Sequence, residues 1–144
     1  MGRTNSFENE IALLLFNNTA IADIGDASGL QPSAVDGLFY IALYSVMPTD
    51  STNGTEATYT GYARVSVARS VVGWTISGTD PTRAENASDI VFPTSSTSET
   101  ILGASICFTI SGVPKYYGTF TTAFSVINGY TPTISATDFK ISFN

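Results

Sequence analysis

Near the start of the chain, apolar residues recur at the spacing of a helix. One predicted helical face holds Phe7, Ile11, Leu14 and Leu15. The run Asn5–Glu8 offers an N-cap side chain and an acidic residue three positions later, which is typical of a helix start. We therefore expect a helix within residues 1–18. Because Phe16 widens its apolar surface, a sheet or a neighbouring chain should cover the helix on more than one side.

Beyond residue 37, apolar positions recur every second residue, which predicts strands. Leu38–Tyr44 has apolar or aromatic residues on both faces, as expected of a strand that is covered on both sides. The longest predicted strand is Thr100–Ile110, and Lys115–Thr121 and Ala123–Ile127 are predicted as two further strands. The dipeptide Asn128-Gly129 that follows indicates a hairpin turn.

Two polar stretches, residues 48–61 and 79–87, are predicted as loops between the strands. The spacing of the remaining segments is typical of an antiparallel β-sandwich or jelly roll of about eight strands. We predict a mainly β fold in a single domain that spans residues 1–144. The N-terminal α-helix occupies residues 1–18 and the strands occupy residues 37–144.

Charged residues are scarce, at 12% of the chain, where about 25% is usual. The only lysines are Lys115 and Lys140. Because β-proteins guard exposed sheet edges with lysine, their scarcity predicts edges that neighbouring chains cover. The alternative is a monomer kept in solution by hydroxyl groups and a net charge of −6. We expect a homo-oligomer, a trimer or dimer, with interface residues among Phe7, Ile11, Phe16, Tyr116 and Tyr117.

The chain has no histidine and a single cysteine. Catalysis by Ser-His-Asp or Cys-His groups and metal sites with histidine ligands are therefore excluded. Cys107 lies in an apolar run and is interpreted as a small buried side chain. The absence of an intrachain disulfide agrees with folding in a reducing cytosol.

Carboxylates are the remaining candidates for chemistry. Asp23 and Asp26, with Ser28, are candidate oxygen ligands for Ca²⁺, but their spacing is not that of an EF-hand and a solvated turn is favoured. Asp80 and Glu85 are the best acid/base pair, and loop solubility is the favoured interpretation there too. We therefore predict no catalytic residue, no metal, no cofactor and no enzymatic activity.

Aromatic side chains are able to form either a sugar-stacking platform or core and subunit contacts. The candidates are Tyr40, Tyr44, Tyr59, Tyr62, Trp74, Tyr116 and Tyr117. We expect Trp74 in the core and part of the Tyr116-Tyr117 pair in a subunit contact. The acidic balance and the six scattered basic residues argue against a nucleic-acid partner. The longest apolar run, Ile11–Phe16, is too short for a membrane partner to be expected.

Several segments, in this order, resemble a family of small tailed-bacteriophage virion proteins often labelled tail fibre protein. The resemblance covers nearly the whole chain and rests on Ser6–Leu15, Leu38–Tyr44, Tyr59–Val65, Ile90–Pro93, Tyr117–Phe120 and Ile134–Phe143. The chain reads Tyr44-Ser-Val-Met-Pro where family members often read His-Thr-Ala-Asp-Pro. The resemblance implies a structural protein of the virion that is made in the cytoplasm of the host bacterium.

The place in the virion is a further prediction. A fibre shaft is expected to show repeats or a long coiled coil, and the sequence shows neither. We therefore predict a capsid decoration or cement protein on the capsid exterior, with the major capsid protein as a partner. The alternative is a tail fibre, tail-tip or baseplate accessory protein that takes part in the recognition of host glycans.

Overall fold

The helix and strands fall into two sets in a computed structural model that describes residues 2–143. Unit 1 is formed by Met1–Gly37, Ala68–Asp89 and Ser135–Asn144, and unit 2 by Leu38–Val67 and Ile90–Ile134. Each unit is built from segments that are distant in the sequence. That the two units constitute one domain stays a prediction.

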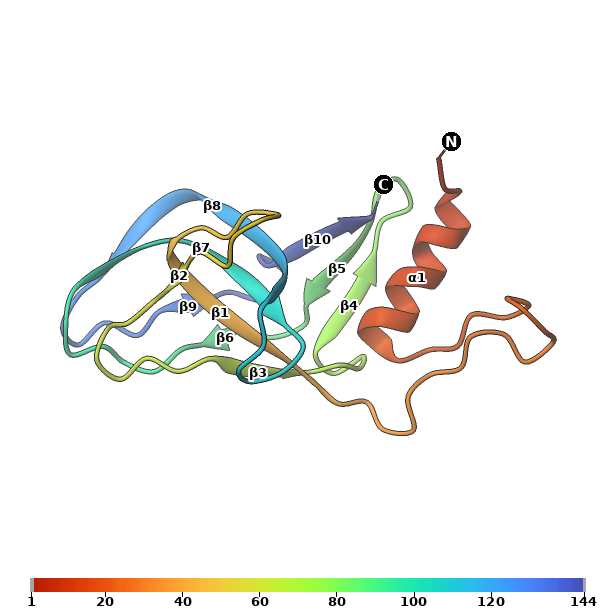
Figure 1. Cartoon of the computed structure of the whole chain (residues 1–144), viewed down its shortest axis with the longest axis horizontal. Helices are drawn as coiled ribbons and strands as arrows, with labels where there is room; N and C mark the ends of the chain where they lie inside the picture. The colour runs from red at the N-terminus through yellow and green to blue at the C-terminus, as the bar shows by residue number, and fades with distance from the viewer. Residues whose placement is uncertain (1, 144) are drawn as a thin grey trace. The chain divides into compact units, whose positions relative to one another are not determined.

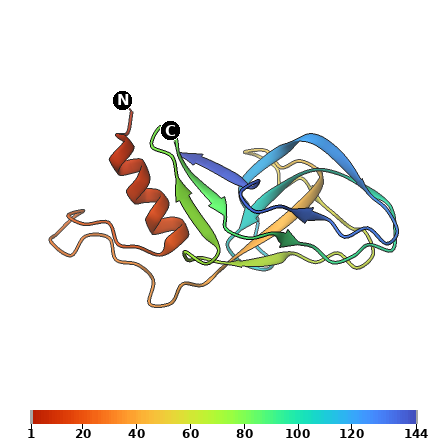
Figure 2. The ribbon, with the colours of Figure 1, turned by 180° about the vertical axis from the view of Figure 1, so that it is seen from behind.

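Unit 1 consists of one helix and a three-stranded antiparallel sheet. Helix α1 (Asn5–Asn17) packs against the sheet, whose strand order is β10-β5-β4, and Figures 1 and 2 both show the helix beside these strands. The strands are β4 (Trp74–Ser77), β5 (Thr82–Asn86) and β10 (Lys140–Phe143). The Phe16 ring meets the rings of Trp74 and Phe143, with centroids 4.9 and 6.0 Å apart. These aromatic contacts hold the helix on the sheet.

The ends of α1 follow the expected capping chemistry with one correction. The N-cap is Thr4, whose side-chain oxygen accepts a hydrogen bond from the Phe7 backbone N–H at 3.4 Å. The predicted cap at Asn5–Glu8 is thus displaced towards the N-terminus. The helix ends at Asn17, and the following C-cap residue, Asn18, adopts a left-handed conformation with φ 54°, as residues just beyond a helix often do.

Unit 2 is dominated by a five-stranded antiparallel sheet. The strand order is β2-β1-β7-β8, and β3 also pairs with β1. The bounds are β1 (Leu38–Val46), β2 (Thr55–Glu56), β3 (Val65–Ala68), β7 (Glu99–Cys107) and β8 (Pro114–Val126). A separate two-stranded sheet joins β6 (Ile90–Val91) to β9 (Thr133–Ile134). The expected central strand is β1, and residues Ile41–Tyr44 in it are all buried.

The prediction of a mainly β, antiparallel fold with one N-terminal helix is confirmed. Residues 2–143 contain ten strands in three sheets, where about eight strands are expected from the sequence. Two strands lie inside predicted loops: the short β2 in residues 48–61, and β5 in residues 79–87. β5 is paired on both sides, by β4 and β10, and buries Thr82, Ala84 and Asn86. The loop prediction failed because these buried side chains are small or polar.

The C-terminal half requires two further corrections. Asn128-Gly129 does form a turn, closed by a hydrogen bond from the Tyr130 N–H to the Ile127 carbonyl at 2.9 Å. It does not close a hairpin, because the strand before it, β8, pairs with β7 and the strand after it, β9, pairs with β6. The two predicted strands on either side of Thr122 form the single strand β8, which has 13 residues and exceeds the predicted longest strand in length.

Candidate functional site

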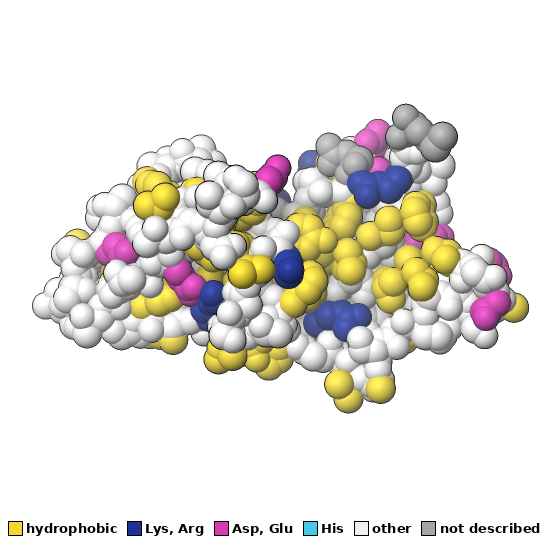
Figure 3. Space-filling view, in the orientation of Figure 1, with side chains coloured by type: hydrophobic (Ala, Val, Ile, Leu, Met, Phe, Trp, Pro, Cys, Tyr) yellow, Lys and Arg dark blue, Asp and Glu magenta, His cyan; other side chains and the backbone are white. Residues whose placement is uncertain are grey.

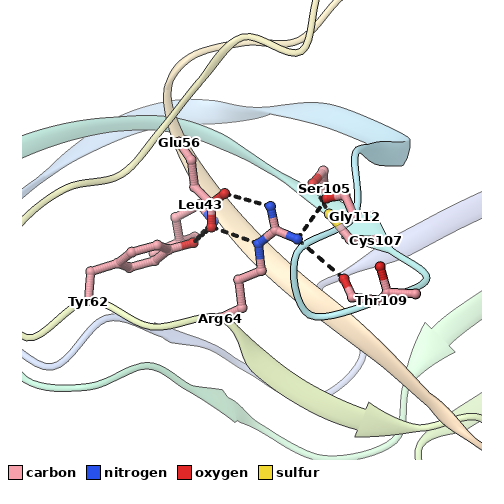
Figure 4. A network of polar contacts seen from close by, with 8 residues as sticks. All are labelled: Leu43, Glu56, Tyr62, Arg64, Ser105, Cys107, Thr109 and Gly112. Carbon is pink, nitrogen blue, oxygen red and sulfur yellow. Dashed lines mark hydrogen bonds and ion pairs between the residues drawn. The ribbon is translucent and has the colours of Figure 1, made fainter.

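The polar residues of unit 2 converge on the guanidinium of Arg64. Its Nε and Nη2 atoms donate to the two carboxylate oxygens of Glu56 at 2.9 and 2.7 Å. Its Nη1 atom donates to the backbone carbonyls of Gly112 and Thr109 at 2.8 and 3.3 Å (Figure 4). We call Glu56, Tyr62, Arg64 and these two carbonyls the arginine clasp. The clasp joins the end of β2, the residue before β3 and the turn between β7 and β8.

Tyr62 connects the clasp to the central strand. Its hydroxyl donates to the Glu56 carboxylate at 2.7 Å and accepts the backbone N–H of Leu43 at 3.0 Å. Leu43 belongs to β1, next to Tyr44, where the short β2 is paired. The tyrosine hydroxyl thereby gives a partner to a backbone N–H on the edge of β1, which would otherwise be costly to bury.

Burial and charge together set the protonation states of the clasp. Burial opposes the ionisation of Glu56, but the hydrogen bonds from Arg64 and Tyr62 outweigh it and lower the pKa of the carboxyl group. The hydrogen bonds to Glu56 raise the pKa of Arg64 against the opposing effect of burial. Burial and then the bond to Glu56 raise the pKa of Tyr62. Glu56 is therefore anionic and Arg64 cationic at neutral pH.

The donors and acceptors of the clasp are engaged within the protein. Glu56 accepts three hydrogen bonds and Arg64 donates four, out of the five N–H groups that a guanidinium offers. The arginine side chain is 13% exposed and the glutamate side chain 28% exposed. Little capacity therefore remains in the clasp for hydrogen bonds to a substrate.

A cavity of about 210 Å³ adjoins the clasp. Tyr44, Glu56 and Arg64 line it together with Asn53, Gly54 and Ser111–Pro114. Its volume is below the roughly 300–1,000 Å³ of typical ligand pockets. The cavity is therefore a gap beside the clasp and not a site that defines a ligand.

The clasp fixes a turn that carries exposed apolar side chains. We call Phe108–Val113 the apolar turn, in which Phe108, Ile110 and Val113 are 45%, 67% and 46% exposed. Phe108 stacks on Phe39 of β1 with ring centroids 5.5 Å apart. The Gly112 N–H donates to the Thr109 carbonyl at 3.0 Å. Because Arg64 binds this turn at two carbonyls, its apolar side chains are presented on a fixed backbone.

A second arginine organises unit 1. Arg69 donates to the backbone carbonyls of Leu14 and Leu15 and to the Asn18 side-chain oxygen at 3.0, 2.8 and 2.6 Å. It also donates to the Ser33 hydroxyl at 2.9 Å and the Asp36 carbonyl at 3.3 Å. We call this set the Arg69 anchor. It places a positive charge at the C-terminus of α1, whose own last turn has no basic residue.

The structure places the carboxylates singled out from the sequence in a polar turn and on or just before β5. Asp26 accepts the Ser28 N–H at 2.7 Å, as in a polar turn, and Asp23 is exposed. Glu85 lies on β5, 3.9 Å from the Lys140 ammonium, and Asp80 is exposed before that strand. Within residues 2–143, no group of three or more acidic or cysteine side chains is arranged to hold a metal ion.

The aromatic candidates divide between core and surface. Trp74 is fully buried, as predicted, and Cys107 is buried as well. Tyr44 and Tyr59 are also buried, at 2% and 3% exposed, so neither ring is available for stacking on a sugar. Tyr117 is 44% exposed, and its hydroxyl donates to the Asp50 carboxylate at 2.6 Å.

The five predicted interface residues lie in both units. In unit 1, Phe7 is 37% exposed, Ile11 is half-buried and Phe16 is fully buried. In unit 2, Tyr116 is half-buried and Tyr117 is exposed. Their role as subunit contacts stays a prediction.

The two arginines are the important residues that the sequence did not reveal. Arg64 reaches Glu56 across a polar loop and reaches Thr109 and Gly112 from far away in the chain. The available signal in the sequence is the scarcity of charged residues. Because the chain has only six basic residues, few of them are left for the solvent-exposed surface. On the face drawn in Figure 3, charged side chains are few and most of the surface is uncharged. In the described part of the chain, no helix has the length and apolar content to cross a membrane.

These features define a β-rich protein in which two arginine networks hold turns and a helix end. Residues 3–142 match the family model Gp80, described as podophage GP4 fiber I protein gp80. The match covers nearly the whole chain, so the chain belongs to this family of phage fibre proteins. No curated protein matches the chain. The resemblance to phage proteins labelled tail fibre is thereby confirmed.

The prediction of a capsid cement protein is wrong. The matched family is a fibre family, so the chain is a fibre component of the virion, not a subunit of the capsid exterior, and the major capsid protein is not supported as its partner. The inference failed because it required a fibre protein to be long and repetitive. Contacts between compact subunits also generate extended assemblies, so a small β-protein is able to be part of a fibre.

Proposed function

We propose that this chain is a non-catalytic subunit of a podophage tail fibre that acts by assembly with copies of itself and with other fibre proteins. Membership of the fibre family supports the location. The observation that carries the non-catalytic role is the saturation of the arginine clasp, whose charged groups are bonded to each other and to the backbone. Such a network contributes rigidity and leaves no poised acid or base.

The apolar turn supports the assembly role. Its exposed side chains, Phe108, Ile110 and Val113, are apolar, and the clasp holds their backbone in place. A fixed apolar projection loses little conformational entropy when a partner covers it, which favours association. The same side chains would give no advantage to a subunit that remained alone in solution.

A phage that lacks the gene provides the test. We expect its particles to lack the fibre in electron micrographs, and we expect added purified protein to restore both fibre and infectivity. The double variant Ile110→Ser/Val113→Ser should fold but restore fewer fibres, because it lacks the apolar contact. Val71→Ser/Val72→Ser is a matched control, since these valines are exposed in unit 1 at 70% and 75%.

The catalytic alternative is tested in the same assay. Asp80→Asn/Glu85→Gln removes the best carboxylate pair and should restore fibre and infectivity as well as the wild type does. A variant that rebuilds the fibre but leaves the particles non-infectious would contradict the non-catalytic role. Normal fibres on particles without the gene would contradict the assembly role.

A further inference from the structure

Strand β8 lies at one edge of the five-stranded sheet, and none of the described strands pairs with its outer side (Figure 1). We propose that β8 pairs, edge to edge and antiparallel, with β8 of a second copy of this chain about a two-fold axis. The inference rests on the proposed function, because it supplies one of the self-contacts through which the subunit assembles. It names the strand, the partner and the symmetry.

Comparison with the other edges shows why β8 is exceptional. Proteins protect sheet edges by keeping edge strands very short, because unpaired N–H and C=O groups invite pairing. Among the described strands, every other edge strand has two to four residues: β2, β3, β4, β6, β9 and β10. β8 has 13 residues. The protection used everywhere else is absent from this edge.

Charge, the other common protection, is almost absent as well. Between Glu99 and Asp138 the only charged residue is Lys115, which lies near the start of β8. Each copy carries a net charge of −6, so two copies repel each other over most of their surfaces. β8 contains no acidic residue, and the acid beside it, Asp50, accepts a hydrogen bond from the Tyr117 hydroxyl. The strand is therefore the place where two copies meet with the least repulsion.

The side chains of β8 suit a second strand. Alternate positions from Lys115 to Ser125 are exposed, and threonine or tyrosine occupies the middle of this series. β-branched and aromatic residues form favourable pairs across strands. The pairing with β7 shifts between Thr119 and Phe124, which bends the centre of β8. A two-fold axis at Phe120 gives both copies this bend at the same point.

The same axis fixes the register of the pair. Antiparallel pairing centred on Phe120 places Thr119 of one copy opposite Thr121 of the other. Lys115 lies opposite Ser125, so the two lysines occupy opposite ends of the joint and each faces an uncharged residue. The register therefore brings no like charges together.

The test introduces like charges at the centre of this register. In Thr119→Lys/Thr121→Lys, four lysines meet across the axis, and we expect self-association to weaken about a hundredfold or more. Wild-type protein should show twice the 15.2 kDa mass of the chain in light scattering after gel filtration, and the variant should show one chain mass. Both positions are exposed, so circular dichroism should report an unchanged fold. The control Thr58→Lys/Thr133→Lys adds the same charge at exposed positions elsewhere in unit 2 and should remain a dimer.

A charge exchange makes the test specific to β8 pairing with β8. Thr119→Glu/Thr121→Glu should also be monomeric alone, but an equal mixture of the lysine and glutamate variants should form a dimer. A monomeric wild type, a wild type of three chain masses, a dimeric lysine variant or a monomeric mixture would each overturn the proposed pairing. The fibre restoration assay with the lysine variant separates the β8 pairing from the proposed fibre role. Normal fibres from a monomeric variant would reject β8 pairing in the virion and leave the fibre role intact.

Discussion

Arg64 and Arg69 stand on either side of β3, and each organises a different unit. Arg64 binds a carboxylate and two carbonyls in unit 2. Arg69 binds only neutral oxygens in the Arg69 anchor, three of them at the end of α1 in unit 1. The same side chain therefore stabilises one unit through an ion pair and the other through carbonyl groups and the helix dipole.

This difference has an energetic consequence. The loss of Arg64 would leave the mostly buried Glu56 carboxylate without its counter-charge. Removing one partner of a buried ion pair in this way is strongly destabilising. The loss of Arg69 leaves neutral carbonyls, several of which lie at a helix end where water is able to replace the guanidinium. Unit 2 should therefore depend more strongly on its arginine, and its dependence should vary with pH.

Arg64→Met should have the largest effect. We expect a loss of about 3 kcal/mol in the free energy of unfolding, because Glu56 stays buried and unpaired. Urea denaturation followed by tryptophan fluorescence and circular dichroism measures the loss. Arg83→Met is the matched control, since Arg83 is exposed on β5 and should change stability by less than about 0.5 kcal/mol. Equal losses from both variants would show that the clasp adds nothing beyond a surface charge.

Arg69→Met should have a smaller effect, about 2 kcal/mol, from the loss of charged hydrogen bonds and of the favourable charge at the helix end. The distinguishing readout is pH. The loss should be the same at pH 7 and pH 4, because the oxygens that Arg69 contacts do not titrate. A loss that disappears in acid would show that a carboxylate, such as that of Asp36, is the true partner.

How far the sequence predicted this molecule depended on whether the signal was local. The period of α1 and the alternation in β1 are local, and so both elements were predicted correctly. β5 was missed because its buried positions are Thr82, Ala84 and Asn86, which look polar when read alone. Its burial comes from its two partner strands, which no local pattern reports.

The clasp could not be predicted for the same physical reason. Arg64 and Gly112 are 48 positions apart in the sequence, with residues 68–89 of unit 1 between them, and only the β7–β8 turn brings them together. The place in the virion was missed because a compact sequence without repeats was taken to exclude a fibre. The order of segments from Ser6 to Phe143 nevertheless identified the broader class, and the match over residues 3–142 specified the fibre.

Lowering the pH should also distinguish the two units, through a smaller change in the free energy of unfolding. The pKa of Glu56 is lowered in the folded protein, so its ionisation contributes stability above the unfolded pKa of about 4.3. That contribution is lost as the pH falls from this value through the folded pKa. Glu56→Gln should therefore flatten the decline in unfolding free energy below about pH 4.5. The comparison is Glu10→Gln, at a half-buried position of α1. An unchanged acid slope in Glu56→Gln would contradict the assignment of this titration to the clasp.

Raising the pH should produce the smallest change in the free energy of unfolding, and the groups responsible again lie in unit 2. Burial and the neighbouring Glu99 raise the pKa of Tyr59 to about 12, and burial and the bond to Glu56 also raise the pKa of Tyr62. For a raised pKa, the stability contribution is complete below the unfolded value of 10.0 and is lost as the pH rises through the folded value. Tyr62→Phe should cost about 1 kcal/mol at pH 7 through its lost hydrogen bonds. It should also make the decline between pH 10 and pH 12 shallower, as measured by urea titrations at each pH. The Tyr62 hydroxyl must keep its proton to donate to Glu56. If the unfolding free energy of Tyr62→Phe declined with rising pH as steeply as that of the wild type, Tyr62 would be free to ionise in the folded protein. The clasp would then not need its hydroxyl.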